Sequence, residues 1–326
     1  MKSGRELLDE IGTSVCSSPT LWWLGHSGFA LKYRNAILYV DPFLSESSAP
    51  FSGSEVAHAG LILCTHFQHV DPQTVPAMLD ASARAKLVIP KSAAGPANSL
   101  GIPYSRMVTT DSGLRVEYLD DRIYAVPSAR DELDWTPLGG YPYLGYLVRF
   151  GGITIYHAGD CVPYDDIVAR LRPYSVTVAI LPIGGRPHNF EIAEAAQLAE
   201  DIEARWLVPM NYPVARIDRF IEHMLGHRPA MAAPSDPTPT PAGDDALLES
   251  LVAACLESWA RAGAGALDDL CAQHPAHAAR LRARIDKLRD LGIVTLADDV
   301  SIASDEAVPE RIGPYEIVDL RPRRHG

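Results

Sequence analysis

Residues 64–74 read Cys-Thr-His-Phe-Gln-His-Val-Asp-Pro-Gln-Thr, and this segment says more about the fold than any other part of the chain. It continues the apolar run at residues 61–63, whose composition and length are typical of a buried strand. Two imidazoles, those of His66 and His69, therefore lie just beyond a predicted strand. An Asp-Pro pair follows them and predicts a turn.

Further sequence blocks flank this segment. They lie at residues 22–29, 41–45, 156–160, 181–186, 194–196 and 209–212. In this order and spacing, the blocks and residues 64–74 resemble the UlaG-like (ascorbate-6-phosphate lactonase-like) branch of the metallo-β-lactamase-fold superfamily. The resemblance covers roughly residues 20–220. It implies an α/β fold, the αβ/βα four-layer sandwich.

The predicted secondary structure agrees with that fold class. Strands bounded by Gly, Pro, Asn and Asp are predicted at residues 21–24, 36–40, 86–89, 114–118, 122–126, 143–150, 153–157, 176–181 and 206–209. Helices are predicted at residues 164–171 and 191–203, the second from its apolar periodicity. Antiparallel strands followed by β-α-β units fit the four-layer sandwich.

The resemblance also assigns metal-ligand positions. In the family, the loop after the strand reads Thr/Ser-His-x-His-x-Asp-His, often followed by Leu-Asp-Pro-x-Thr. His66 matches the first histidine of this loop and His69 the last. Only Phe67 and Gln68 lie between them, so the simplest alignment removes two residues, and with them the second histidine and the aspartate. Gln68 is the one candidate to fill the place of the second histidine.

The remaining ligand positions are also changed. Arg130 stands where the family has its third histidine, Asp160 matches the bridging aspartate, and Asn211 replaces the final histidine. Arginine stays protonated and cannot bind a cation. Amide oxygens are weak ligands for borderline-soft metals. The resemblance therefore implies a degenerate site, and it predicts an ion pair between Arg130 and Asp160.

One metal-like set survives: His66, His69 and Asp160. Two histidines and one carboxylate can hold non-haem iron, so we expect either no cofactor or one divalent metal ion (Zn, Mn or Fe). Cys161 is a possible fourth ligand, although it is also explained as a small packed side chain. The two histidines have a second explanation, as relict residues hydrogen-bonded to Asp71 or Asp160.

Three functions remain open. The first is a ligand-binding protein for a small molecule, without standard hydrolase activity, in which Gln68, His188, Asn211 and Tyr212 contact the ligand. The second is a single-metal hydrolase or non-haem iron enzyme using His66, His69 and Asp160. The third is metal-free acid/base catalysis by the same three residues, with Arg130 stabilising an anionic intermediate.

The amino-acid composition limits which partners and which cellular location we expect. The formal charge of −12 on 326 residues argues against nucleic-acid binding. No apolar run approaches the length of roughly 18 residues that a membrane span needs, so no membrane association is expected. Five scattered cysteines without CxxC spacing indicate free thiols and a cytoplasmic location.

The domain organisation changes after residue 228. Residues 1–228 form the predicted metallo-β-lactamase-like domain, and residues 229–243 are a Pro-rich linker. Residues 244–326 form a small C-terminal helical module and tail, with apolar faces at residues 247–259, 267–271 and 279–291. These faces must be covered, so a homo-oligomer formed through the C-terminal helices is one expectation.

This organisation predicts a protease-sensitive linker. Proline denies the segment both helical and ladder hydrogen bonds, so limited proteolysis should cut first between residues 231 and 244. A folded body of about 230 residues should remain, detectable by mass spectrometry and circular dichroism. A cut at this place that unfolds the body would show that the helices belong to its core.

Overall fold

The computed structural model describes residues 4–46, 49–226, 251, 255, 265–290 and 318–319. The described residues fall into two compact units. The large unit contains Gly4–Leu225 and the short strand at residues 318–319, and the small unit contains two C-terminal helices. The large unit carries every candidate site residue.

The first sheet of the large unit has six strands, and their order in space follows their order in the sequence. Strands β1, β2 and β3 pair antiparallel, and β3 to β6 pair parallel. The strands are β1 (Thr20–Gly25), β2 (Gly28–Tyr33), β3 (Ala36–Val40), β4 (Leu61–Leu63), β5 (Lys86–Pro90) and β6 (Met107–Thr110). The carboxyl ends of the parallel strands therefore meet at one edge of the sheet.

The second sheet has seven strands in the order β13-β12-β11-β10-β9-β8-β7. Neighbours from β7 to β10 pair antiparallel, β10 to β12 pair parallel, and β13 closes the sheet antiparallel to β12. The strands are β7 (Arg115–Tyr118), β8 (Asp121–Pro127), β9 (Leu144–Phe150), β10 (Ile153–His157), β11 (Val178–Pro182), β12 (Trp206–Met210) and β13 (Val318–Asp319).

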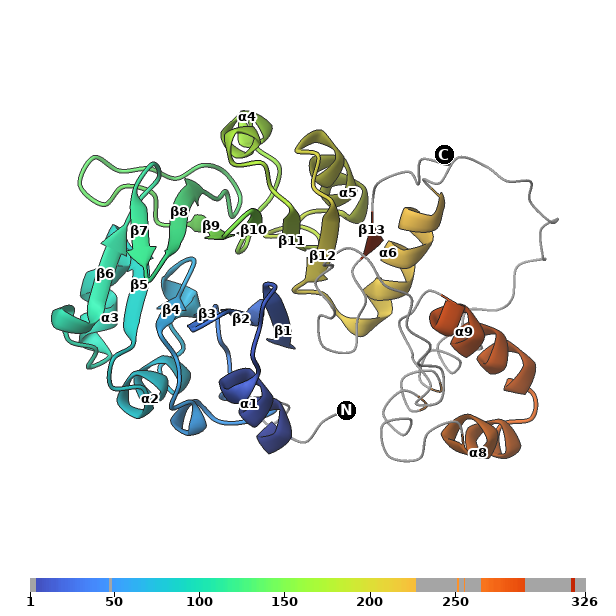
Figure 1. The fold of residues 1–326 in the computed structure, drawn as a ribbon. Helices are drawn as coiled ribbons and strands as arrows, with labels where there is room; N and C mark the ends of the chain where they lie inside the picture. Colours follow the sequence, from blue (N-terminus) through green and yellow to red (C-terminus); the bar gives the residue numbers. More distant parts are fainter. Residues whose placement is uncertain are drawn as a thin grey trace. The chain divides into compact units, whose positions relative to one another are not determined.

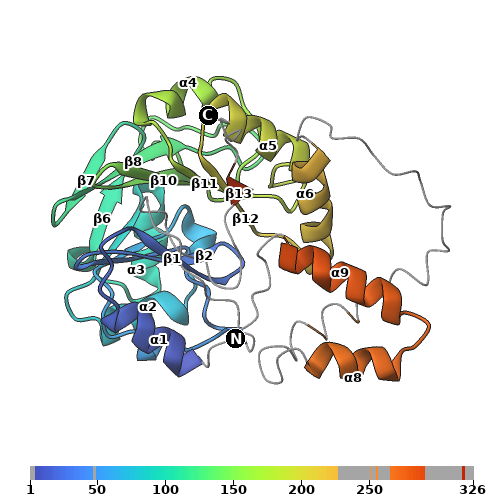
Figure 2. The same ribbon diagram turned by 45° about the vertical axis from the view of Figure 1, so that its right-hand side comes forward.

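Helices cover the outer faces of the two sheets (Figures 1 and 2). The first sheet carries α1 (Gly4–Thr13), α2 (Thr74–Ala81) and α3 (Ala94–Ser99), and the second carries α4 (Ile167–Leu171), α5 (Ile192–Asp201) and α6 (Val214–Gly226). This arrangement is the four-layer α/β sandwich that the sequence predicted. No described helix combines the length and the apolar character that a membrane span requires.

The first sheet is buried on both faces. Tyr39, Ile62 and Leu87 belong to an apolar cluster that also includes Ile11 of α1 and Met78 of α2. Their strand neighbours Leu38, Leu63 and Val88 are equally buried but lie outside that cluster. Because successive side chains of a strand point to opposite faces, the second set faces the other sheet. Continuous apolar runs such as residues 61–63 are explained by this double burial.

Most predicted elements are present with small shifts. The ends of the predicted strands β5 and β7 to β12 differ from the observed ends by at most two residues. The predicted helix at residues 164–171 begins only at Ile167, because Asp166 adopts a left-handed conformation with φ 70°. Helix α5 begins at Ile192, since Glu191 and Glu194 form a capping box at its start.

The small unit contains α8 (Gly265–Gln273) and α9 (Ala278–Asp290), which match two of the three predicted apolar segments. Leu267 and Cys271 of α8 and Leu281 and Ile285 of α9 are buried. Their burial explains the apolar spacing in these two helices. The predicted linker at residues 229–243 and most of the first predicted apolar face lie outside the described residues.

The Asp-Pro turn after His69 joins the site loop to α2. Asp71 accepts a hydrogen bond from the Thr74 backbone N–H at 2.7 Å and one from Ser45 Oγ at 3.2 Å. Thr74 Oγ1 in turn accepts a hydrogen bond from the Leu44 N–H at 2.8 Å. Asp71 therefore stabilises the first turn of α2 and the loop that follows β3.

This role predicts a measurable loss of stability. Asp71→Ala should lower the free energy of unfolding by about 1–2 kcal/mol, as the loss of a helix-capping oxygen does. Urea denaturation followed by circular dichroism measures the change. Asp71→Asn keeps an acceptor oxygen and should retain most of the stability, and Asp80→Ala on the exposed face of α2 should be neutral. Equal losses in both Asp71 variants would instead assign the effect to its charge.

Candidate functional site

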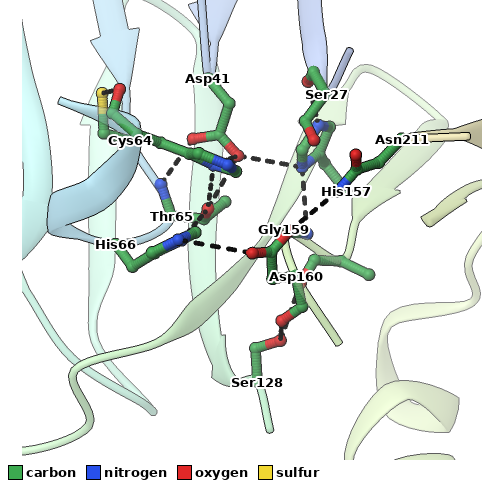
Figure 3. Close-up of polar contacts among 12 residues, drawn as sticks. Ser27, Asp41, Cys64, Thr65, His66, Ser128, His157, Gly159, Asp160 and Asn211 are labelled. Carbon is green, nitrogen blue, oxygen red and sulfur yellow. Dashed lines mark hydrogen bonds and ion pairs between the residues drawn. The ribbon is translucent and has the colours of Figure 1, made fainter. Parts of the chain in front are cut away.

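The candidate site lies where the carboxyl ends of strands from both sheets meet (Figure 3). Each of its residues directly follows a strand or lies a few residues beyond one. They are Asp41 after β3, Thr65, His66 and His69 after β4, Arg130 after β8, Asp160 after β10 and Asn211 after β12. Parallel strands bring their carboxyl ends to one edge, so residues far apart in sequence converge there.

A buried carboxylate, Asp41, organises the first half of the site. It accepts hydrogen bonds from the Thr65 N–H and the Thr65 hydroxyl, both at 2.7 Å, and its Oδ2 lies 2.7 Å from His69 Nδ1. Burial alone would raise the pKa of Asp41, but His69, with smaller effects of His157 and His66, lowers it to about 2. Asp41 is therefore an anion that fixes the backbone and side chains after β4.

The hydrogen bonds of Thr65 determine the tautomer of His66. The single hydroxyl proton of Thr65 goes to Asp41, so Thr65 Oγ1 accepts from His66 Nδ1–H at 3.0 Å. His66 Nε2 is then unprotonated. It lies 3.6 Å from Asp160 Oδ2 (Figure 3). Burial, followed by the charge of His69, lowers the pKa of His66 well below its usual value, so the ring is neutral.

His69 is oriented in the same way. Its Nδ1–H donates to Asp41, which leaves Nε2 free for another partner. Burial lowers the pKa of His69, but the adjacent Asp41 more than reverses this effect, and the net pKa is raised. The rings of His66 and His69 lie 4.1 Å apart. A short 3-10 turn at Phe67–His69 brings them together.

His66, His69 and Asp160 form a group that could hold a metal ion. One possible ligand atom from each lies within 4.8 Å of the other two. His66 Nε2 and Asp160 Oδ2 both carry lone pairs, and they face each other at 3.6 Å. Two bonds of about 2.1 Å at a tetrahedral angle would separate these atoms by about 3.4 Å. The donor set and its spacing therefore fit one cation.

Asp160 has two further partners. Its Oδ1 accepts a hydrogen bond from Asn211 Nδ2 at 3.1 Å, and Arg130 Nε lies 3.7 Å from its Oδ2. The predicted ion pair between Arg130 and Asp160 is confirmed. Asn211 also donates to Asn189 Oδ1 at 3.2 Å. Arg130 and Asn211 thus place a guanidinium and an amide around the carboxylate, where the family resemblance has histidines.

The loop that carries Asp160 is held from both sides. Ser128 Oγ lies 2.9 Å from the carbonyl oxygen of Ala158 and 2.8 Å from that of Asp160. Gly159 has φ +65°, and a Cβ there would lie 2.8 Å from Thr65 Cβ, so only glycine fits. Close contact between the Gly159 and Thr65 loops brings Asp160 of the second sheet up to His66 of the first.

His157 supports the site without joining the metal-like group. Its Nε2–H donates to the Ser27 carbonyl at 2.8 Å, and its Nδ1 accepts from the Gly159 N–H at 3.2 Å. Both ring nitrogens are therefore used. Burial lowers its pKa, although Asp41 acts in the opposite direction. This neutral, fully bonded imidazole therefore supports the site without a free nitrogen for a ligand.

Two sequence-based alternatives are not realised. Asp71 does not bond to either histidine; it accepts from Thr74 and Ser45 instead, and Asp41 takes the role of partner to His69. Cys161 is buried and is not part of the metal-like group. Its Sγ lies 3.4 Å from the Val162 carbonyl oxygen, and burial raises the pKa of its thiol to about 11.

The candidate ligand-contacting residues differ in position. Gln68 is exposed on the 3-10 turn between His66 and His69. His188 Nδ1 lies 3.3 Å from Asp131 Oδ1, beside Arg130. Tyr212 follows Asn211 and stacks on Trp23 with ring centroids 6.0 Å apart. Of these residues, Asn211 donates a hydrogen bond to Asp160.

Sequence reasoning gave no role to three contributors. Asp41 was included only in the block at residues 41–45, yet its carboxylate orients His69. Tyr143 places its ring 5.3 Å from that of His66, and Asn189 accepts from Asn211. A charged residue directly after an apolar strand, as Asp41 is, was the signal that could have been used.

Comparison with known proteins agrees with this fold. A model of the beta-lactamase superfamily domain matches residues 20–211. A UPF0173 metal-dependent hydrolase of Thermococcus kodakarensis is 31% identical over 218 residues, which cover 63% of this chain and 92% of that protein. A UPF0173 metal-dependent hydrolase of Myxococcus xanthus is 28% identical over 207 residues, covering 59% of this chain and 69% of that protein.

Solved structures are similar in fold at low identity. The diiron beta-hydroxylase CmlA from Streptomyces venezuelae has a TM-score of 0.51 at 16% identity, covering 65% of this chain and 52% of its own. An isothiocyanate hydrolase from Delia radicum gut bacteria has a TM-score of 0.50 at 15% identity, covering 62% and 92%. On the match over residues 20–211 and the archaeal relative, the chain belongs to the metallo-β-lactamase-fold superfamily.

Proposed function

We propose that this protein is a divergent metal-dependent hydrolase of the superfamily that works with a single divalent ion. His66, His69 and Asp160 would hold the ion. The observation that supports this best is the facing pair of lone-pair atoms, His66 Nε2 and Asp160 Oδ2, 3.6 Å apart in a buried site. Such a pair is unfavourable unless a proton or a cation lies between them. Two relatives are named metal-dependent hydrolases, and this favours a cation over a proton between the two atoms.

The surroundings of Asp160 argue against a second ion. Arg130 places a permanent positive charge 3.7 Å from Asp160 Oδ2. Asn211 uses its Nδ2 donor toward Asp160, so the amide does not offer an acceptor in that direction. A second cation would have to approach a guanidinium with too few ligands. We therefore propose that two-metal hydrolysis has been lost.

The chain's own residues would each have a defined task. Asp41 and Thr65 hold the two imidazoles with Nε2 free, as supporting carboxylates do in metal proteins. Asn211 orients Asp160, and Arg130 balances its charge. A bound divalent ion supplies Lewis-acid chemistry and can be Zn, Mn or Fe by its donor set. The same set keeps non-haem iron chemistry as an alternative.

A metal-free binding protein is the second candidate. Arg130 and Asn211 already compensate the charge of Asp160, and this could stabilise the site with no ion. A small-molecule ligand would then contact the surrounding residues without hydrolysis. Metal-free acid/base catalysis by His66, His69 and Asp160, with Arg130 stabilising an anionic intermediate, is the remaining alternative. Metal content separates this candidate from the single-metal enzyme.

Three broader assignments accompany this proposal. The UlaG-like branch is supported by the Asp-Pro-x-Thr sequence after His69. A cytoplasmic location is supported by five free cysteines, all buried. A homo-oligomer through the C-terminal helices rests on their apolar faces.

The first prediction concerns metal content. Protein purified without added metal or chelator should contain at most about one equivalent of Zn, Mn or Fe by inductively coupled plasma mass spectrometry. His66→Ala and Asp160→Ala should each lose it, because each removes one of three ligands. His26→Asn, a change at an exposed histidine, should keep it. Two equivalents in the wild-type protein would contradict the single-ion site, and none would favour the metal-free candidate.

The second prediction concerns activity. Lactones and phosphodiesters that suit two-metal relatives should be hydrolysed little or not at all, because no second ion assists the reaction. Any turnover that remains should disappear in both His66→Ala and Asp160→Ala. Activity that survives both changes would belong to another site or to a contaminant, and it would speak against catalysis by this group.

A further inference from the structure

The Arg130 guanidinium is under-used in the described structure. Arginine carries five N–H donors, and this side chain is about a third exposed, at 29%. Its Nε atom is buried and makes no hydrogen bond. The contact of Nε with Asp160 Oδ2, at 3.7 Å, is an ion pair that is longer than a hydrogen bond. A buried donor without an acceptor destabilises the structure, so an acceptor oxygen from a bound molecule would stabilise this nitrogen.

His188 also has a buried nitrogen that makes no hydrogen bond. Its Nδ1 is buried and makes no hydrogen bond, although Asp131 Oδ1 lies 3.3 Å away. Asp131 is the residue after Arg130, so this contact links His188 to the segment that carries the arginine. Burial and His69 lower the pKa of His66, Asp41 raises it, and Arg130 and His188 make smaller contributions that lower it. Both groups therefore lie within electrostatic range of the metal-like group.

A closed series of contacts links Arg130 and His188 to Asp160. Asp160 accepts from Asn211, and Asn211 donates to Asn189, the residue after His188. His188 contacts Asp131, and Arg130 returns to Asp160. Three loops, after β8, β11 and β12, are thus tied to each other and to the end of β10. The two nitrogens without a hydrogen bond therefore lie within one connected set of contacts.

We propose that Arg130 and His188 form a subsite for an oxyanion, the carboxylate or phosphate group of a small substrate, beside His66, His69 and Asp160. The inference rests on the proposed function, and it adds the class of substrate. Guanidinium N–H groups match the paired oxygens of carboxylate and phosphate, and an imidazole N–H adds a further donor. The anion would be held at Arg130 while another part of the same molecule reaches the group beside it.

The nearby acidic groups permit such an anion. Asp131 is 65% exposed, so water screens its charge. Asp160 is buried, but Asn211 and Arg130 already oppose its charge. Asp41 is paired with His69. Attraction of an oxyanion to the Arg130 donors would therefore exceed its repulsion from these carboxylates, because each carboxylate is screened or compensated.

Binding of simple anions to the full-length protein tests the subsite. Inorganic phosphate and acetate would be titrated by calorimetry at constant ionic strength, into protein as purified and into the same protein after chelation. We expect at least one of the two anions to bind both to the protein as purified and to the chelated protein. Arg130→Gln should weaken binding about ten- to hundredfold, as loss of charged hydrogen bonds does, and Arg130→Lys should restore part of it. His188→Gln should weaken it several-fold.

The control is Arg115→Gln, which changes the net charge equally at an exposed arginine paired with Glu117 on β7. It should leave binding unchanged. Tighter binding of phosphate than of acetate would indicate a substrate with a phosphate group. Tighter binding of acetate would indicate a substrate with a carboxylate group. If the melting temperature shows that Arg130→Gln does not fold, anion binding to His188→Gln tests the subsite instead.

Three results would overturn the subsite. They are no binding of either anion, binding that requires the metal, and binding that survives in folded Arg130→Gln or His188→Gln protein. Metal content measured on the same samples reports separately on His66, His69 and Asp160. Failure of the anion subsite and failure of the single-metal site are therefore distinguishable.

Discussion

The site depends on one buried carboxylate. Asp41 is only 2% exposed, yet it stays ionised because three donors from Thr65 and His69 point at it. Those bonds join the loop after β3 to the loop after β4 and determine which nitrogen of each imidazole carries the proton. Without this carboxylate, buried N–H and O–H groups would lose their acceptor, at a cost of about 1–3 kcal/mol for each unsatisfied group.

The loop after β4 brings two histidines together. The His69 N–H donates to the His66 carbonyl at 3.1 Å, and the Val70 N–H donates to that of Phe67 at 2.8 Å. This single 3-10 turn places the two ring centroids 4.1 Å apart, with the ring planes tilted by 47°. The proximity of the two rings therefore follows from local backbone geometry and from Asp41, which orients His69.

The fold and part of the site could be predicted from sequence, and the reasons are physical. Apolar runs and turn residues are local signals, so strands such as β9 and β10 were placed within a residue of their ends. The Arg130–Asp160 pair followed from charge compensation. The bond between His69 and Asp41 could not be predicted, because it joins residues 28 positions apart through two parallel strands. Asp71, which lies closer in sequence, was the wrong candidate.

The contacts of Asp160 explain how this site can keep a place for one cation. Asn211 donates a hydrogen bond to Oδ1 at 3.1 Å, whereas Arg130 approaches Oδ2 only to 3.7 Å. The guanidinium thus offsets the charge without forming the short bonds that would occupy the oxygen. On its other side, Oδ2 faces the unprotonated His66 Nε2. Of its two oxygens, Asp160 therefore has the less satisfied one directed at the imidazoles, where a bound ion would complete its contacts.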